Sequence, residues 1–328
     1  MTPSPHRWIS DAAITRLRRL EDWPDFTGTR YEIDEVIGRG GMGIVFRGRD
    51  RALDREVAIK VTSLATADDA ARLRAEARTL ARLEHPGIVA VHDVGQLADG
   101  RVFAVMRLVR GARLDACAPA LTLADRLRLF DRMCEAVAFA HARGVVHGDL
   151  TPANIMVGAH SDLLVVDWGL ARRSNSEFVN SQLHNFTTPK QLPTTNEIAS
   201  ESRVAELGVA ELGRGTEGYR APEPGGGPRA DVYALGAILR DLLPSPRTRA
   251  MRPLDSVVRR ATAADPGRRY PGAAELAEDV RHFVDGAAVA AHRESVAEQA
   301  VRLARAYRTP IGLVLAYLAM RSLLLYWQ

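Results

Sequence analysis

The chain has 328 residues, of which 46% are hydrophobic and 26% are charged. It is therefore long enough for about two domains and apolar enough to bury a sizeable core. Its 44 basic and 40 acidic residues leave a net charge of +4, a balance that does not indicate nucleic-acid binding. The two cysteines, Cys117 and Cys134, lack C-x-x-C spacing, so we expect reduced structural thiols.

Residues 1–27 form an N-terminal extension. One short helix is predicted in it, from Asp11 to Leu20, followed by a break at Trp23-Pro24. The first residues lack a basic region followed by an apolar run, so we expect no signal peptide.

From Tyr31 the pattern becomes strand, glycines, strand. The spacing G-x-G-x-x-G occurs in dinucleotide-binding turns and in phosphate-binding hairpins, but a dinucleotide-binding turn needs a helix directly after the glycines. Here Ile44-Val45-Phe46 continues as strand, which predicts a hairpin whose backbone amides approach phosphate groups. The predicted phosphate-binding residues are Gly38, Arg39, Gly40, Gly41, Met42 and Gly43.

A β-rich triplet, Val57-Ala58-Ile59, ends in Lys60. After it a helix is predicted from about Asp68 to Leu83, because its apolar residues recur on one face. Glu76 lies beside that face on an otherwise basic helix and therefore needs a partner, for which Lys60 is the candidate.

The most informative stretch runs from His147 to Asn154 and reads H-G-D-L-T-P-A-N; Asp167-Trp168-Gly169 follows. It comes after a long predicted helix that Thr122 caps and Gly144 ends. Phosphoryl transfer needs a base near the acceptor hydroxyl and oxygen ligands on magnesium. Asp149 would be the base, and Asn154 and Asp167 would hold the metal.

These motifs, in this order, resemble those of the bacterial eukaryotic-type (Hanks-type) serine/threonine protein kinases. The family set is H-R-D-x-x-x-x-N, D-F-G and A-P-E with an upstream glycine loop; here it reads H-G-D, D-W-G and Ala221-Pro222-Glu223. The resemblance implies an α+β, two-lobed fold with a small β-rich N-lobe and a larger helical C-lobe. It also implies transfer of the γ-phosphoryl group of ATP, with Mg²⁺, to Ser or Thr of protein substrates.

Carried onto this chain, the resemblance places the N-lobe at 28–109 and the C-lobe at 110–286, with a long activation segment at 167–223. Lys60 would bind the α- and β-phosphates and pair with Glu76. Met106 to Val109 would form the hinge that holds adenine through backbone groups. The apolar faces of the adenine slot would be Val45, Ala58 and Met156.

The resemblance also assigns structural roles. Asp231 would fix the catalytic-loop backbone, and Arg269 would pair with Glu223. His147 would pack with Trp168 rather than act as a base. No helix is visible at 247–253, where the family has one that often docks substrates, and Thr216 would approach the catalytic Asp.

Two catalytic-loop residues depart from the family pattern. Gly148 replaces the arginine that commonly pairs with a phosphorylated activation loop, so that form of switching loses its usual partner. Thr151 replaces a lysine that contacts the γ-phosphate. Removing one positioned cation costs on the order of 10²-fold in rate. We still count Thr151 with Asp149, Lys60 and Glu76 among the catalytic residues.

Two alternatives stay open. H-G-D followed by a non-lysine also resembles the aminoglycoside and choline phosphotransferases, although the glycine loop, the A-P-E motif and the segment around Asp231 favour a protein kinase. The other alternative is a nucleotide-binding pseudokinase scaffold. Against it stands the presence of Lys60, Glu76, Asp149, Asn154 and Asp167.

A basic helix is predicted at 287–308, followed by a candidate transmembrane segment at 309–327. Residues 311–327 would rise about 25 Å, the short limit for a span. Arg321 would cost roughly 2.5 to 3.5 kcal/mol, against about 0.3 to 0.6 kcal/mol gained per Leu, Ile or Val. The preceding arginines and Tyr326-Trp327 favour a cytoplasmic kinase domain anchored in the membrane, the alternative being a packed or surface-bound helix. The sequence does not indicate an oligomeric state.

Overall fold

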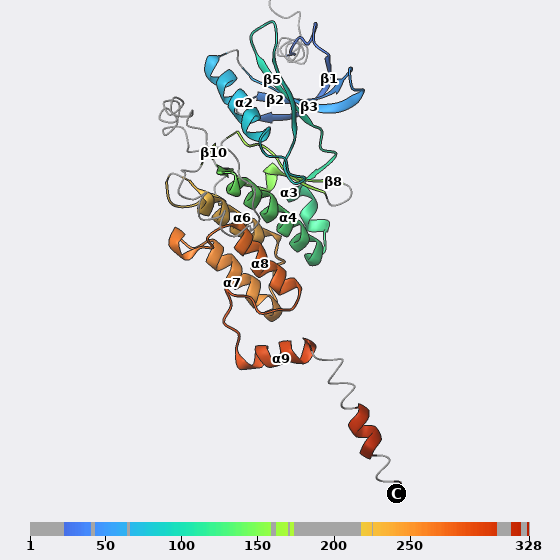
Figure 1. Ribbon diagram of the computed structural model, residues 1–328, viewed down its shortest axis with the longest axis vertical. Coiled ribbons are helices and arrows are strands. Elements are labelled where there is room, and N and C mark those ends of the chain that lie inside the picture. The colour runs from blue at the N-terminus through green and yellow to red at the C-terminus, as the bar shows by residue number, and fades with distance from the viewer. Residues whose placement is uncertain are drawn as a thin grey trace, which may run out of the picture. The chain divides into compact units, whose positions relative to one another are not determined.

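The computed structural model describes residues 23–40, 43–63, 66–158, 162–169, 171–173, 218–224, 226–306, 316–322 and 327. Two compact units make up the chain (Figure 1): Met1–Glu84 with Val89–Val109, and His85–Ile88 with Arg110–Gln328. The predicted helix at 11–20 and residues 174–217 of the predicted activation segment lie outside the described residues.

The first unit contains a five-stranded antiparallel sheet of order β1-β2-β3-β5-β4. Its strands are β1 Tyr31–Gly40, β2 Gly43–Asp50, β3 Arg55–Val61, β4 Val91–Gln96 and β5 Val102–Arg107. β1 and β2 form the predicted hairpin, because the chain continues as strand after the glycines.

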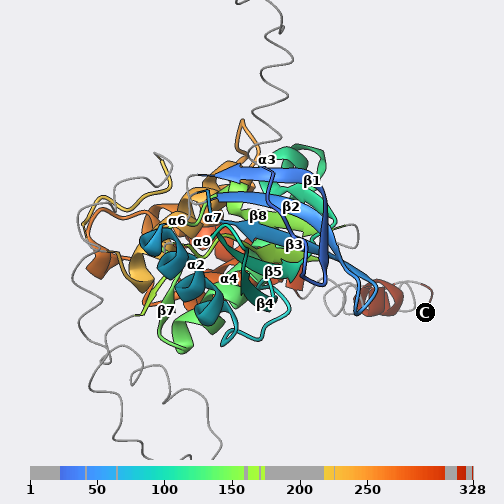
Figure 2. The same cartoon turned by 90° about the horizontal axis from the view of Figure 1, so that it is seen from above.

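Helix α2, Ala67–Leu80, packs against β4 and β5 on one face of this sheet (Figure 2). It starts where expected, because the Thr66 side chain accepts a hydrogen bond from the Asp69 amide and so caps the first turn. It ends three residues before the predicted Leu83. Its contact with the sheet is made by Ala70, Leu73, Ala77, Val102 and Ala104.

The opposite face of the sheet is covered by the chain that enters β1. Phe26 packs on Phe103 with ring centroids 5.0 Å apart, and Trp23 meets Phe46 edge-on at 5.3 Å. Burying an aromatic or aliphatic side chain contributes about 1.5 to 3 kcal/mol. The compact unit therefore includes residues before position 28, where the lobe was predicted to begin.

The second unit is mainly helical. Its helices are α3 Leu114–Cys117, α4 Leu123–Ala142, α6 Pro228–Leu242, α7 Arg252–Ala261, α8 Ala273–Val284 and α9 Val296–Ala306. Its short strands are β6 Gly111–Arg113, β7 Val145–Val146, β8 Ile155–Gly158, β9 Leu163–Val165 and β10 Arg172–Arg173. Its 3₁₀ turns are Ala118–Ala120, Pro152–Asn154, Arg249–Met251 and Pro266–Arg268.

Helices α4, α6, α7 and α8 pack side by side (Figure 1). α4 has the predicted ends, since Thr122 accepts from the Asp125 amide and Gly144 adopts a φ of 71° just after the last turn. Between α6 and α7 the described chain forms only a 3₁₀ turn, so the expected lack of an α-helix holds for 247–251 but is wrong at 252–253, where α7 begins. These observations confirm the α+β, two-lobed fold.

The predicted basic helix at 287–308 is shorter in the structure, because α9 begins only at Val296. The chain between α8 and α9, here called the strap, does not form a helix. The amides of Ala290 and Ala291 in it donate to the buried carboxylate of Asp279, at 2.7 and 3.0 Å. Backbone groups that serve this carboxylate are not free for helical bonds. Of 309–327 the structure describes a helical turn at 316–322 and residue 327, and no described helix is long and apolar enough to span a membrane.

Candidate active site

Lys60 and Glu76 form the predicted pair. The Lys60 Nζ donates to both carboxylate oxygens of Glu76, at 2.9 and 2.8 Å. Both residues are buried, with 8% and 6% of their surface exposed. Strand β3 and helix α2 thus fix a lysine ammonium group on the helix-covered face of the sheet.

Three apolar residues predicted to contact adenine or the hinge share that face. Val45 lies directly opposite Lys60 in the β2–β3 pair, and Ala58 lies opposite Met106 in the β3–β5 pair. Cross-strand partners point to the same side of a sheet, as do residues two apart along a strand. Val109 follows β5 and is half-buried, whereas Met156 lies on β8 in the other unit.

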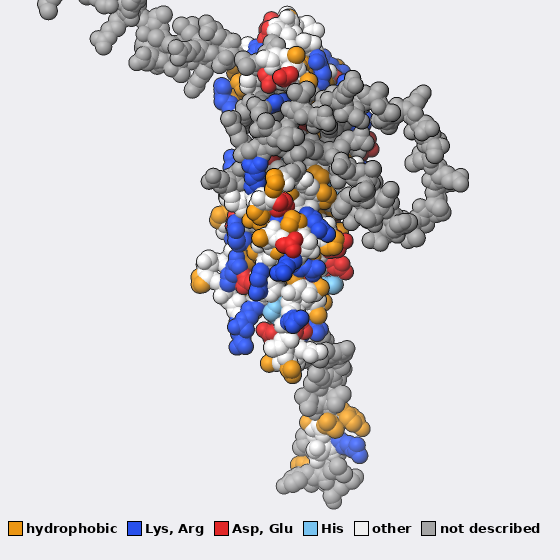
Figure 3. Space-filling view, turned by 90° about the vertical axis from the view of Figure 1, so that its left-hand side faces the viewer, with side chains coloured by type: hydrophobic (Ala, Val, Ile, Leu, Met, Phe, Trp, Pro, Cys, Tyr) orange, Lys and Arg blue, Asp and Glu red, His pale blue; other side chains and the backbone are white. Residues whose placement is uncertain are grey.

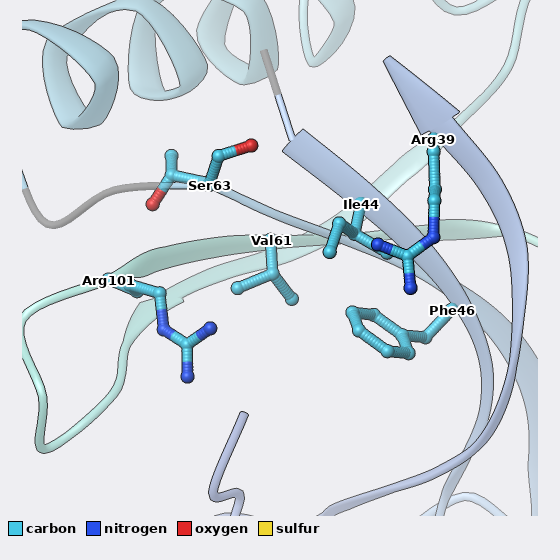
Figure 4. Close-up of a pocket in the computed structure, with 7 residues that line it drawn as sticks. Arg39, Ile44, Phe46, Val61, Ser63 and Arg101 are labelled. Carbon is cyan, nitrogen blue, oxygen red and sulfur yellow. The ribbon is translucent and has the colours of Figure 1, made fainter. Parts of the chain in front are cut away.

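Arg39 differs from its neighbours in the glycine hairpin. It pairs with Ile44, and Ile44 pairs with Val61, so its side chain lies on the face opposite Lys60. There it lines a cavity of about 220 Å³ together with Phe46, Ser63 and Arg101 (Figure 4). Only the Arg39 backbone therefore stays in the predicted phosphate site.

The glycine at position 43 is required by packing. Its φ is 152°, and a Cβ added there would lie 2.1 Å from the carbonyl oxygen of Val61. A side chain would force the start of β2 away from the end of β3. Gly41 and Met42 lie outside the described residues.

Asp231 of α6 holds the loop that carries Asp149. Its carboxylate accepts from the backbone amides of His147 and Gly148, at 2.8 and 2.9 Å, as predicted. Burial raises the pKa of Asp231, but the hydrogen bond with His141 and the loop amides outweigh it, so the pKa lies below its usual value. The loop backbone is thereby tied to an ionised group inside the helical core.

His141 is a functional residue that the sequence analysis missed. Its Nε2 lies 2.8 Å from Oδ2 of Asp231, and the side chain is buried. His141 follows Val137 by four residues and therefore shares the buried face of α4. That spacing was the available signal, but it gives no partner.

Asp149 is half-buried, and one of its oxygens has no partner. The Asn154 Nδ2 donates to the Asp149 carbonyl at 2.8 Å and approaches Oδ2 at 3.4 Å. Oδ1 is buried without a hydrogen bond among the described residues. Burial, and next the negative charge of Asp167, raise the pKa of Asp149 to about 6, against the opposing effects of Asn154 and Arg220. A carboxylate of this pKa suits general-base work near neutral pH.

Asp167 and Trp168 point in opposite directions. Asp167 is exposed and adopts a φ of 61°, while Trp168 is buried and donates through Nε1 to the Val165 carbonyl. The Trp168 ring packs on His147 at 4.6 Å between centroids. Burial lowers the pKa of His147, so its ring is neutral, which confirms a packing role.

Glu223 and Arg269 form the second predicted ion pair. The guanidinium donates to both carboxylate oxygens, at 2.7 and 2.6 Å, and also to the Arg229 carbonyl at 2.8 Å. Burial raises the pKa of Glu223, but the Arg269 hydrogen bonds outweigh it and the pKa is lowered. The segment at 218–224 is thus fixed to the helical core, whereas Thr216 lies outside the described residues.

Comparison with known proteins decides the family. A family model described as the protein kinase domain matches residues 31–286. This chain belongs to that family. It is 32% identical over 304 residues to the serine/threonine-protein kinase PknB of Mycolicibacterium smegmatis. The matched region covers 81% of this chain and 44% of that protein.

Two further relatives carry similar names. PknD of Mycobacterium tuberculosis is 31% identical over 284 residues, covering 75% of this chain and 38% of the relative. PknB of Mycobacterium leprae is 31% identical over 299 residues, covering 78% and 43%. The chain therefore spans less than half the length of these curated kinases.

In this kinase domain the donor set fits magnesium. Asn154 and Asp167 offer carboxamide and carboxylate oxygens, and the bond from Asn154 Nδ2 to Asp149 leaves the amide oxygen as an acceptor. The described residues hold no group of three or more His, Cys, Asp or Glu suited to a metal. Mg²⁺ usually takes one or two protein ligands and completes its octahedron with water and phosphate oxygens. Asn154 and Asp167 would hold it.

Thr151 is more enclosed than a γ-phosphate contact requires. Only 4% of its surface is exposed, and its carbonyl accepts from the Asn154 amide at 3.0 Å. Gly148, which replaces the family arginine, is exposed and has a φ of 79°. The loop therefore lacks a guanidinium at position 148 and an ammonium at position 151.

Proposed function

We propose that this chain is a serine/threonine protein kinase that transfers the γ-phosphoryl group of ATP, with Mg²⁺, to Ser or Thr of proteins. The observation that carries the proposal is the buried Oδ1 of Asp149, an unpaired acceptor in a loop fixed by Asp231. An acceptor hydroxyl would supply the missing hydrogen bond. The names of the relatives, serine/threonine-protein kinases, support the same chemistry.

Each side chain has one task in this proposal. Asp149 orients the acceptor hydroxyl and takes its proton. Asn154 and Asp167 hold Mg²⁺, which neutralises charge on the phosphates when it is bound. Lys60, held by Glu76, binds the α- and β-phosphates, and the hairpin amides of residues 38–43 approach them. Thr151, which stands where the family has the lysine that contacts the γ-phosphate, supports this loop through its carbonyl, which accepts from the Asn154 amide.

The adenine contacts remain a proposal carried by sheet register and resemblance. Val45 and Ala58 would supply apolar contacts from the face that carries Lys60, and the backbone of Met106 and Val109 would supply hydrogen bonds. Met156 would supply the remaining apolar contact. Backbone recognition is compatible with the exposed Arg107 between them.

A protein acceptor is favoured over a small molecule. The segment 218–224, fixed through Glu223 and Arg269, gives a preformed surface beside the catalytic loop, since the charge of Arg220 reaches Asp149. A scaffold without turnover would not require a base with a pKa near neutrality. Both points support turnover on proteins.

We further propose that residues 309–327 associate with a membrane. The support is their apolar composition and the arginines before them. The test is to compare the full chain with a chain ending at residue 308 in binding to anionic phospholipid vesicles, with retention of transfer activity as the control for folding.

The experiment for the main proposal uses purified protein and radiolabelled ATP with generic protein acceptors and an aminoglycoside panel. We expect label on protein Ser or Thr and none on aminoglycosides. Asp149→Asn should retain nucleotide binding and lose about 10² to 10⁴-fold in transfer rate. Nucleotide binding by the wild type without transfer to any acceptor would establish the scaffold instead.

A further inference from the structure

The chain between α6 and α7 is rich in exposed arginine. Arg240, Arg247 and Arg249 are all exposed, and within 240–250 the only acid is Asp241. On the face drawn in Figure 3, basic side chains lie over the helical unit among acidic and hydrophobic ones. A connection this short would need no such charge to pack, because its apolar residues Leu242 and Leu243 already lie in the core.

Hydrogen bonds join these arginines to the segment next to the catalytic loop. The Tyr219 hydroxyl donates to Asp241 Oδ2 at 2.6 Å, and Arg240 donates to Asp241 Oδ1 at 3.1 Å. Arg247 in turn donates to the Arg240 carbonyl at 3.1 Å. Tyr219 precedes Arg220, whose positive charge acts on Asp149. Hydrogen bonds therefore link Tyr219, next to Arg220, to Arg247, and Arg249 follows two residues later in the chain.

We call Arg220, Arg240, Arg247 and Arg249 the arginine row. Three acids face it: Asp149, which the charge of Arg220 reaches, Asp241, which serves Tyr219 and Arg240, and Asp255, which pairs with Arg247. No ion pair is recorded for Arg249 with any described residue. From Arg240 to Arg249, three arginines against Asp241 and Asp255 leave an excess of positive charge. Ion pairs this exposed are worth little, so an incoming carboxylate can replace them.

We infer that the arginine row binds an acidic segment of the protein substrate while its Ser or Thr lies at Asp149. This inference rests on the proposed kinase function and names its substrate class. Guanidinium groups bind carboxylates in a bidentate fork, and a row of them raises the local concentration of an acidic acceptor. The hydrogen bonds that join Tyr219 to Arg240 and Arg247 place the acidic residues a few positions from the acceptor.

A peptide fits this surface better than a lipid bilayer. Arginines that bind membranes are usually accompanied by exposed apolar side chains that enter the interface. Among the described residues, none of the exposed large apolar side chains lies in 240–252.

The test compares peptides with the same central Ser or Thr and either acidic or neutral flanks. For the wild type we expect about tenfold higher kcat/KM on the acidic peptides at low salt, and a smaller ratio at 0.5 M salt, where exposed charges are screened. Arg249→Glu should reduce the preference, and Arg247→Glu with Arg249→Glu should remove it. Rates on the neutral peptides should stay unchanged.

The matched control is Arg128→Glu on α4. Arg128 is also exposed and paired with one aspartate, Asp125, but it does not belong to the row. This variant should keep the acidic preference. Arg247 contacts Asp255 and Arg240, so the double variant could lose folding, which would lower its rate on neutral peptides as well. In that case the single Arg249→Glu variant decides the outcome.

Equal rates of the wild type on acidic and neutral peptides would overturn the inference, as would an unchanged preference in Arg249→Glu and in the double variant. Loss of binding to anionic vesicles in the double variant, with its peptide preference intact, would assign the row to lipids and also overturn it. Failure of the wild type to label any peptide or protein would refute the proposed function, and the inference with it.

Discussion

Lys60 donates to both carboxylate oxygens of Glu76 in a site where each side chain is at most 10% exposed. Removing one partner of a buried ion pair leaves the other charge uncompensated and costs about 3 to 5 kcal/mol, whereas replacing both by apolar residues is often neutral or stabilising. We therefore expect Lys60→Met to lose stability and transfer together. The double change Lys60→Met with Glu76→Leu should recover stability without recovering transfer.

Thermal unfolding and transfer rate, measured on both variants, separate the two roles of the pair. A double variant as unstable as the single one would show that Lys60 and Glu76 contribute through other contacts. Recovered transfer would contradict a role for Lys60 in phosphate binding. Either result is unambiguous because both measurements come from the same preparation.

The pKa of Asp149, raised to about 6, predicts the pH dependence of the rate. Only the ionised carboxylate accepts a proton, so kcat/KM should fall about tenfold per pH unit below 6 and level off above about 7. A profile measured at fixed free Mg²⁺ gives the inflection. An inflection near pH 4 would mean that Asp149 is not desolvated in the working enzyme.

The same shift acts on stability with a defined sign. Because the folded pKa of Asp149 is raised, the folded state binds more protons than the unfolded state between about pH 4 and 6, and the free energy of unfolding contributed by this group decreases as pH rises through that window. Asp149→Asn removes this contribution. We expect the variant to gain thermal stability relative to the wild type at pH 8 and to gain none at pH 4, where both proteins carry a neutral side chain.

Asp231 accepts two loop amides and contacts His141, so its loss should destabilise the catalytic loop. Asp231→Ala leaves the buried His147 amide and the buried His141 ring without this partner, at about 1 to 3 kcal/mol for each, and also frees the more exposed Gly148 amide. For a domain of this size we expect the midpoint of unfolding to fall by at least about 5 °C. The control is Asp265→Ala, because the exposed Asp265 side chain caps a single turn. This change should shift the midpoint of unfolding by less than 2 °C. Equal effects would contradict the anchoring role.

Motifs that depend on short-range pattern were predictable from the sequence. The ends of α4 follow from Thr122 and Gly144, and the pair Lys60–Glu76 follows from an acid beside an apolar helix face and a family resemblance. The side of the sheet on which Arg39 lies was not predictable. β1 has two register shifts, between Ile33 and Glu35 and between Val36 and Gly38, and each one-residue slip moves later side chains to the other face.

Partners far apart in the chain could not be predicted from the sequence for a related reason. The burial of His141 follows from helical spacing, but its partner Asp231 lies 90 residues later in the chain. The late start of α9 depends on Asp279, whose carboxylate accepts hydrogen bonds from the amides of Ala290 and Ala291 in the strap. The pKa of Asp149 depends on how much water the folded loop excludes, which no local pattern records.

The buried Thr151 allows a test of the missing cation. A lysine there would bring a positive charge into the catalytic loop, and we expect Thr151→Lys to raise kcat, because an added cation that acts on the γ-phosphate stabilises charge in the transition state. The site is only 4% exposed, so the longer side chain should also cost about 1 to 3 kcal/mol of stability. Steady-state kinetics and thermal unfolding measure the two effects separately.

Thr151→Met is the matched control, since methionine has similar length and no charge. We expect it to share the loss of stability and to leave kcat at or below the wild-type value, so that any gain in Thr151→Lys reports the charge. If both variants lower kcat equally with an unchanged KM for ATP, the Thr151 side chain itself contributes to the transition state, and the loop is shaped around a hydroxyl rather than short of an ammonium group.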